Sequence, residues 1–76
     1  MAGITSYDHL DELLLEYMKN IDKEVTAKDI YEHITKTYKT NKIRLNVLKI
    51  AKRLKRFKEV KIIYRKRGIC YYIYQE

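Results

Sequence analysis

Three stretches of the chain carry apolar residues at the spacing of an amphipathic helix. In the first stretch these residues recur at intervals of three and four: Leu10, Leu13, Leu14, Tyr17, Met18 and Ile21. Side chains at this spacing lie on one face of a helix. The pattern predicts a helix from about Tyr7 to Asn20, with Ser6 or Thr5 as its N-cap.

The second stretch opens with a helix-start signal. Thr26 is followed three residues later by Asp29, as in a capping box, and Val25 can pack against Ile30 across the cap. The apolar stripe that follows contains Ala27, Ile30, Tyr31, Ile34 and Tyr38. We therefore expect a second helix that begins at Thr26 and ends near Tyr38.

The third stretch follows a short polar connection, in which Asn41 or Thr40 can serve as the N-cap. Its apolar stripe contains Ile43, Val47, Ile50, Ala51, Leu54 and Phe57. This stripe predicts a third helix from Lys42 to Phe57. Because the connection is short, we expect the second and third helices to form a helix-turn-helix pair.

After the third stretch the period of the apolar residues falls to two. Apolar side chains alternate from Val60 to Tyr64, and Ile69–Tyr74 is again rich in β-branched and aromatic residues, which predicts two strands. The segment Arg65–Gly68 between them supplies a turn, with glycine for a positive φ. A two-stranded hairpin is not stable alone in water, so it should pack on the helices. Val25 is a candidate for a short third strand.

Length and cysteine content narrow the class of protein. A chain of 76 residues is expected to form one domain, residues 1–76. Its single cysteine, Cys70, cannot form an intrachain disulfide, and no Cys and His cluster has zinc-ligand spacing, so we expect no metal and no cofactor. No apolar run spans a membrane and no segment resembles a signal peptide, so we expect a cytoplasmic protein without a membrane partner.

The net charge of +7 is distributed unevenly. As far as Asn41 the chain holds five Lys, no Arg and eight Asp and Glu, whereas residues 42–67 hold twelve Lys and Arg against Glu59 alone. Clustered cations are typical of proteins that bind polyanions, because each phosphate contact releases counterions. No nucleophile, base and orienting group converge in the sequence, so we do not expect an enzyme.

The predicted third helix has one apolar and one basic face on a helical wheel. Arg pairs with guanine and Asn with adenine, an apolar side chain can touch a thymine methyl group, and Lys more often meets phosphate. We therefore expect this helix to contact DNA through Lys42, Arg44, Leu45, Asn46, Lys49, Lys52, Arg53 and Arg56. Base readout is assigned to residues 44–46 and Lys49, and phosphate contact to the later cations. The alternative for Leu45 is burial under the hairpin or in a dimer contact.

Two further segments are candidates for phosphate contact. The turn between the strands gathers three cations next to a glycine: Arg65, Lys66, Arg67 and Gly68. Like charges at one turn repel each other unless phosphates lie nearby. A weaker signal is the start of the second helix, where Thr26 and Lys28 accompany free backbone N–H groups that can bind a phosphate.

Taken together, these features resemble the winged helix-turn-helix family across nearly the whole chain. The resemblance rests on the capped helix at Thr26, the basic helix that ends at Phe57 and the hairpin from Val60 to Tyr74. Richness in Lys, Ile and Tyr, the absence of Pro and the short length are similar to small regulators encoded by viruses and virus-plasmid hybrids of hyperthermophilic crenarchaea such as Sulfolobus. The resemblance implies a recognition helix at Lys42–Phe57 and a wing at Arg65–Gly68. Unlike many members, the chain has no long C-terminal helix for dimerisation.

The sequence thus predicts an α+β protein that acts as a sequence-specific, double-stranded DNA-binding transcriptional regulator, one that can control its own promoter. One recognition helix reads only a few base pairs, so we expect two protomers per site, joined through the exposed face of Ile69–Tyr74 or the acidic face of the first helix. No small-molecule ligand is evident. The alternatives are a sequence-neutral chromatin-like or RNA-binding module and a winged-helix protein-interaction module.

Overall fold

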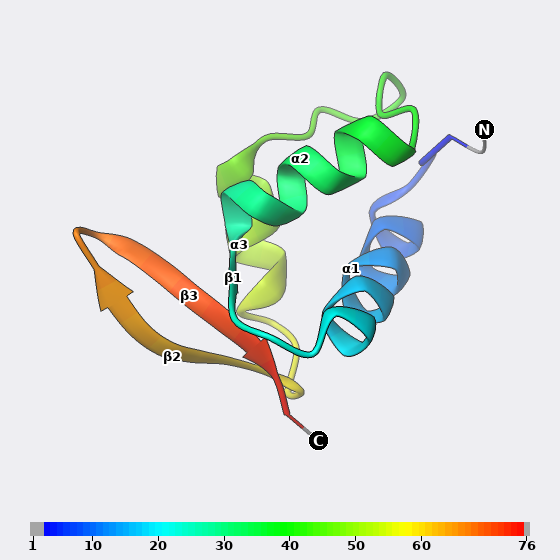
Figure 1. The fold of residues 1–76 in the computed structure, drawn as a ribbon. Helices are drawn as coiled ribbons and strands as arrows, with labels where there is room; N and C mark the ends of the chain where they lie inside the picture. Colours follow the sequence, from blue (N-terminus) through cyan, green and yellow to red (C-terminus); the bar gives the residue numbers. More distant parts are fainter. Residues whose placement is uncertain (1–2, 76) are drawn as a thin grey trace.

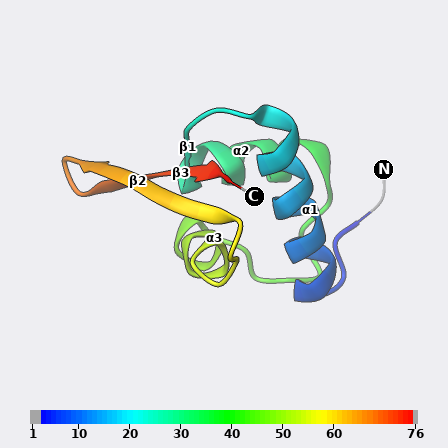
Figure 2. The same cartoon turned by 90° about the horizontal axis from the view of Figure 1, so that it is seen from below.

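The helices and strands follow one another in the order expected from the sequence. The computed structural model describes residues 3–75. Its elements are α1 (Tyr7–Ile21), β1 (Val25–Thr26), α2 (Ala27–Thr37), α3 (Val47–Leu54), β2 (Val60–Lys66) and β3 (Ile69–Tyr74). The hairpin of β2 and β3 projects from beside α3, on the side away from α1 (Figures 1 and 2). This α+β layout of three helices followed by a hairpin is that of a winged helix-turn-helix, which confirms the predicted fold class.

The hydrophobic core is assembled from one face of each helix and from the base of the sheet. Its buried apolar side chains are Ile4, Leu10, Leu14, Met18, Val25, Ala27, Ile30, Ile34, Ile50, Leu54, Val60 and Tyr72. No polar or charged side chain among residues 3–75 other than the Tyr72 hydroxyl joins them. Ile4 was not predicted: its N–H donates to the Lys39 carbonyl at 2.8 Å, which holds the N-terminal segment against the loop after α2. Within residues 3–75, none of the helices has the length and apolar content needed to cross a membrane.

The first two helices begin where the sequence predicts. The Ser6 hydroxyl accepts the N–H of His9 at the start of α1. At the start of α2, Thr26 Oγ1 accepts the N–H of Asp29 at 3.2 Å, and the Asp29 carboxylate accepts the N–H of Thr26 at 3.1 Å. This reciprocal pair is a complete capping box, which satisfies two backbone donors at once.

The third helix is shorter than predicted, and its cap is a different residue. α3 begins at Val47 because Asn46 caps it: the Asn46 side-chain oxygen accepts the N–H of Lys49 at 2.8 Å. The predicted caps Asn41 and Thr40 are therefore wrong, and residues 38–46 form a loop instead of a tight turn. Of the residues assigned to this helix, Lys42, Arg44, Leu45 and Asn46 precede it.

Burial in the loop before α3 alternates from residue to residue. Ile43 and Leu45 are half-buried against the core, and Arg44 between them is exposed. A period of two is typical of extended chain, so the loop buries apolar side chains without being helical. Leu45 therefore does not lie on an outer helical face, whereas Val47, which we expected in the core, is 37% exposed.

The other end of α3 is also earlier than predicted. The helix ends at Leu54, and the chain continues through tighter turns in which the N–H groups of Arg56 and Phe57 donate to the carbonyls of Arg53 and Leu54. Bonds to the third preceding residue are common where a helix terminates. They still bring Phe57 half-buried against the core, as the apolar stripe predicts.

The sheet has three antiparallel strands in the order β1-β3-β2, which confirms a short strand at Val25. Val25 pairs with Tyr72, and burial raises the pKa of Tyr72. The hairpin turns through Arg67 and Gly68, whose φ angles of 52° and 79° are both positive, as a two-residue type I′ turn requires. A β-bulge interrupts β2 between Ile62 and Tyr64, where the register with β3 shifts.

The capping role of Asn46 predicts a difference between two asparagines of the same loop. Replacing Asn46 by Ala should lower the free energy of unfolding by about 1 kcal/mol, because a backbone donor at the start of α3 loses its acceptor. Asn46→Ser should retain most of the stability. Urea denaturation followed by circular dichroism measures these changes.

The matched control is Asn41→Ala, which removes the cap that the sequence suggested. It should change stability by less than about 0.5 kcal/mol, since this exposed side chain makes no hydrogen bond to another described residue. A larger loss for Asn41→Ala than for Asn46→Ala would contradict the observed start of α3.

Candidate nucleic-acid interface

The outer face of α3 carries cations and one exposed leucine. Ile50 and Leu54 point into the core, and the opposite side of the helix exposes Leu48, Lys52 and Lys55. Leu48 is 63% exposed, the highest value among the large apolar side chains of the described residues. Leu48 and Lys55 were not among the predicted DNA contacts, because the third helix was expected to run from Lys42 to Phe57 and its outer face was assigned to other residues.

At one edge of this face an ion pair connects α3 to α1. Arg53 forms two hydrogen bonds with Asp11, Nε to Oδ1 at 2.8 Å and Nη2 to Oδ2 at 2.7 Å. The hydrogen bonds to Asp11 raise the pKa of Arg53. A bidentate pair of this kind is stronger and better oriented than a single contact. Arg53, predicted as a phosphate contact, is thus already neutralised by a carboxylate of the same chain.

Lys49 belongs to the same cluster, through Tyr7. Its Nζ donates to the Tyr7 hydroxyl at 2.9 Å, and that hydroxyl donates to the Arg44 carbonyl at 3.3 Å. Arg53 also lies 5.2 Å from the Tyr7 ring centroid, within cation–π range. Tyr7 therefore joins the start of α1, the loop before α3 and α3 itself.

A shallow hollow opens beside Tyr7 on the α3 side. It is lined by Tyr7, Lys49, Lys52, Arg53 and Arg56. Four of these five residues are cations, and three of the four, Lys49, Lys52 and Arg56, form no ion pair among residues 3–75. The hollow therefore has the charge that an anionic ligand such as a phosphate requires.

The remaining residues that were predicted to contact DNA from the third helix lie in the loop before α3 instead. Lys42 and Arg44 are exposed in the loop, where they remain free to contact a ligand. The Asn46 oxygen that accepts from Lys49 is one of the two groups that a bidentate contact to adenine would use. Asn46 is thus the N-cap of α3, and an adenine contact by Asn46 would have to share this oxygen with the Lys49 N–H.

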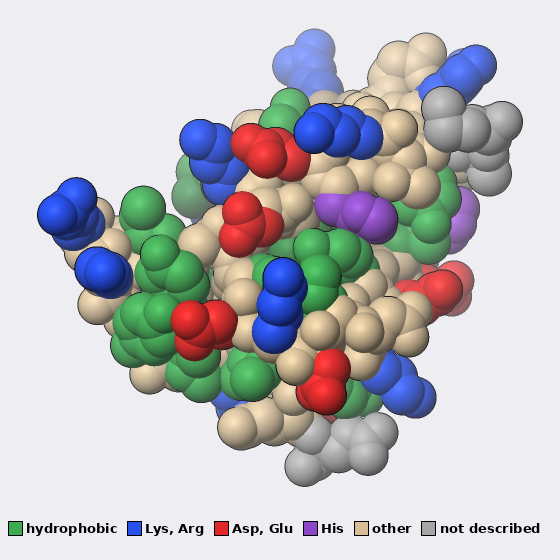
Figure 3. All heavy atoms as spheres, viewed as in Figure 1, with side chains coloured by type: hydrophobic (Ala, Val, Ile, Leu, Met, Phe, Trp, Pro, Cys, Tyr) green, Lys and Arg blue, Asp and Glu red, His purple; other side chains and the backbone are tan. Residues whose placement is uncertain are grey.

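The wing carries the three predicted cations at its end. Arg65, Lys66 and Arg67 are all exposed, and Figure 3 shows Lys and Arg side chains at the tip of the projecting hairpin with hydrophobic side chains along it. Tyr64 and Tyr71, which are partners across β2 and β3, stack with ring centroids 4.6 Å apart. The Tyr64 hydroxyl donates to Glu24 at 2.8 Å, a contact that raises the pKa of Tyr64.

A groove between α3 and the wing is also lined by the start of α2. Its lining residues are Thr26, Ala27, Lys28, Val47, Ala51, Lys55, Gly68, Ile69, Cys70 and Tyr72. The weakly predicted pair Thr26 and Lys28 therefore lies together with α3 and the turn of the hairpin. Cys70 is half-buried here, within β3 as predicted.

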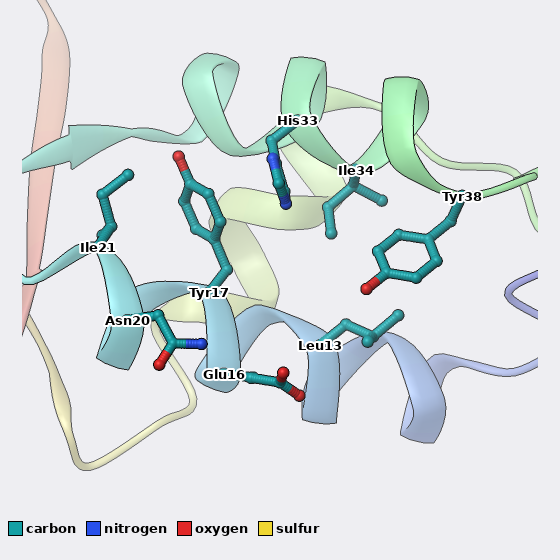
Figure 4. Close-up of a pocket in the computed structure, with 8 residues that line it drawn as sticks. All are labelled: Leu13, Glu16, Tyr17, Asn20, Ile21, His33, Ile34 and Tyr38. Carbon is teal, nitrogen blue, oxygen red and sulfur yellow. The ribbon is translucent and has the colours of Figure 1, made fainter. Parts of the chain in front are cut away.

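A second hollow lies between α1 and α2 (Figure 4). It is lined by Leu13, Glu16, Tyr17, Asn20, Ile21, His33, Ile34 and Tyr38. The rings of Tyr17 and His33 are 4.5 Å apart, and burial raises the pKa of Tyr17. This hollow contains no Lys or Arg, so it lacks the charge expected of a phosphate site. Among residues 3–75, no three His, Cys, Asp or Glu side chains are grouped to hold a metal ion.

Most cations of the basic half of the sequence are exposed. Of the twelve Lys and Arg residues between positions 42 and 67, ten are exposed and only Lys49 and Arg53 are half-buried. Only Arg53 forms an ion pair with a residue of the described part of the chain.

A comparison of the chain with models of protein families, with curated proteins and with solved structures finds no match.

Proposed function

We propose that this protein is a sequence-specific regulator of transcription that binds double-stranded DNA. In this proposal the outer face of α3 enters the major groove, and the wing lies on the flanking backbone or minor groove. The observation that carries the proposal is the set of ten exposed cations on α3, its flanking loops and the hairpin, without carboxylate partners in the described chain. Closely spaced cations repel each other, and a polyanion relieves that repulsion.

The arrangement of the cations supports a duplex rather than a small anion. Lys52 lies on α3 and Arg56 in the turn after it, Lys28 at the start of α2, and Arg65–Arg67 at the hairpin tip. These positions lie on three separate parts of a molecule that measures 32 × 26 × 19 Å, so one phosphate group is not expected to contact all of them. A helix flanked by cations on both sides suits a major groove about 12 Å wide with phosphates on both walls.

Base reading is supported by the apolar content of the same face. Leu48 is exposed among the cations, and an apolar side chain gains nothing from contact with phosphates. Arg44 and Lys42 lie just before α3 and are free to reach bases or backbone at that end of the helix. A sequence-neutral module would need only the cations.

We expect two protomers per DNA site, because one recognition helix contacts only a few base pairs. The outward side of the hairpin is the better of the two contact surfaces considered, because Ile69 and Tyr64 are 50% and 41% exposed and lie near half-buried Tyr71 and Ile73. By contrast, α1 exposes like charges, Asp8, Glu12 and Glu16, which would repel their copies in a symmetric contact.

Selection from a random duplex library, followed by titration of the selected site, tests the function. We expect one enriched motif with two-fold symmetry, saturation at two protomers per duplex, and affinity that falls steeply with salt. Salt-dependent binding without an enriched motif would instead indicate a sequence-neutral module. Absence of salt-dependent binding to duplex DNA or RNA would favour a protein-interaction module.

Lys52 should contribute general affinity through a phosphate. Lys52→Gln should weaken binding to all sequences alike and reduce the slope of log K against log salt by about 0.9, the value for one phosphate contact. Fluorescence anisotropy with selected and random duplexes measures both effects. Lys19→Gln, an equally exposed lysine on α1, is the control and should leave the slope unchanged.

The wing should contribute up to three phosphate contacts. A variant with Arg65→Gln, Lys66→Gln and Arg67→Asn removes the three cations, and Asn at position 67 tolerates the positive φ of the turn. The slope of log K against log salt should fall by roughly 2.7, at about 0.9 for each lost contact. An unchanged slope in a folded variant would exclude the wing from the DNA interface.

Asp11 should reduce the contribution of Arg53 to DNA binding. Asp11→Asn removes the carboxylate that neutralises Arg53, so general affinity for duplex DNA should rise and the salt slope should steepen by up to about 0.9. Glu12→Gln on the same helix removes an exposed carboxylate that is not paired with Arg53 and should change binding less. If Arg53→Gln fails to cancel the gain from Asp11→Asn, Arg53 is not its source.

A further inference from the structure

The first turn of α3 presents two exposed apolar side chains with lysines nearby. Leu48 is 63% exposed and the neighbouring Val47 is 37% exposed. Val47 lines the groove that also contains Lys28 and Lys55, and Lys52 follows Leu48 one turn later on the outer face. Single exposed apolar residues are common, but two adjacent ones on the most basic surface of the molecule call for a ligand that is both anionic and apolar.

Duplex DNA meets both requirements only in the major groove at A·T base pairs. The thymine C5-methyl group is the apolar group that base pairs display in this groove. Phosphates, sugars and the polar edges of the other bases offer no comparable partner for a leucine. We propose that Leu48, supported by Val47, recognises thymine methyl groups, so that the DNA site contains A·T pairs opposite the first turn of α3. This inference rests on the proposed function.

The position of Leu48 in the helix supports this role. It is the second residue of α3, and the first residues of a recognition helix are those that contact base edges. Asn46 fixes the helix start through its bond to Lys49, and burial of Ile50 and Leu54 turns Leu48 outward. Lys52 and Lys55 lie farther along the same face, and their longer side chains reach toward phosphates while Leu48 faces the bases.

Replacement of thymine by uracil in the selected duplex tests the inference directly. Uracil keeps the base pair and the backbone charge and removes only the methyl group. With thymines replaced one at a time, affinity should fall about fourfold at one or two positions, the effect of one buried methyl group. The salt slope should stay unchanged at those positions, because no phosphate contact is lost.

Three variants identify the side chain that contacts the methyl group. Leu48→Ala should abolish the difference between thymine and uracil at the sensitive position, while Lys52→Gln should lower affinity for both duplexes and keep the difference. Leu48 is exposed and Ala favours helix, so the variant should fold, which circular dichroism checks. Val47→Ala should reduce the difference partially.

The outcomes separate this inference from the function on which it rests. Sequence-specific binding that is insensitive to uracil at every position would overturn the inference and leave the proposed function intact. The inference alone is also overturned if Leu48→Ala weakens binding to thymine and uracil duplexes equally. Absence of an enriched motif, or of salt-dependent duplex binding, would overturn both.

Discussion

Asn46 fixes where α3 begins, and the proposed interface depends on this one cap. By accepting the N–H of Lys49, its side chain ends the extended loop and starts the helix at Val47. A helix rotates 100° per residue, so a start at another residue or a few more residues of helix would change which side chains lie at its exposed beginning. The loop before the cap buries Ile43 and Leu45 in alternation, which anchors Asn46 from the other side.

The cluster around Tyr7 performs a different task, because it fixes α3 relative to α1. Arg53 and Asp11 are 42 residues apart in the sequence, as are Lys49 and Tyr7. These contacts are only partly buried, so each contributes little to stability by itself, but together they specify one orientation. Orientation matters for a reading helix, since its side chains must meet base edges at fixed distances. In the same cluster Asp11 neutralises Arg53, whereas the neighbouring cations form no ion pair among the described residues.

Features that depend on neighbouring residues could be predicted from the sequence, and features that depend on distant ones could not. The capping box at Thr26 and the turn at Gly68 are local signals, and both appear where expected. The start of α3 was misjudged because Ile43, Val47 and Ile50 have helical spacing although the first of them is buried by extended chain. The chain also offers asparagine at both 41 and 46, and no acidic residue three positions later distinguishes the true cap.

The edge of the sheet shows a second use for charge in this protein. β2 pairs with β3 on one side only, so its other side presents backbone N–H and C=O groups that a second chain could pair with. Lys61, Arg65 and Lys66 on this strand, together with the bulge after Ile62, oppose such pairing between copies. The charges of the wing, which we propose to contact DNA, therefore also guard against aggregation, and sequence changes that make β2 more neutral would favour self-association through the strand edge.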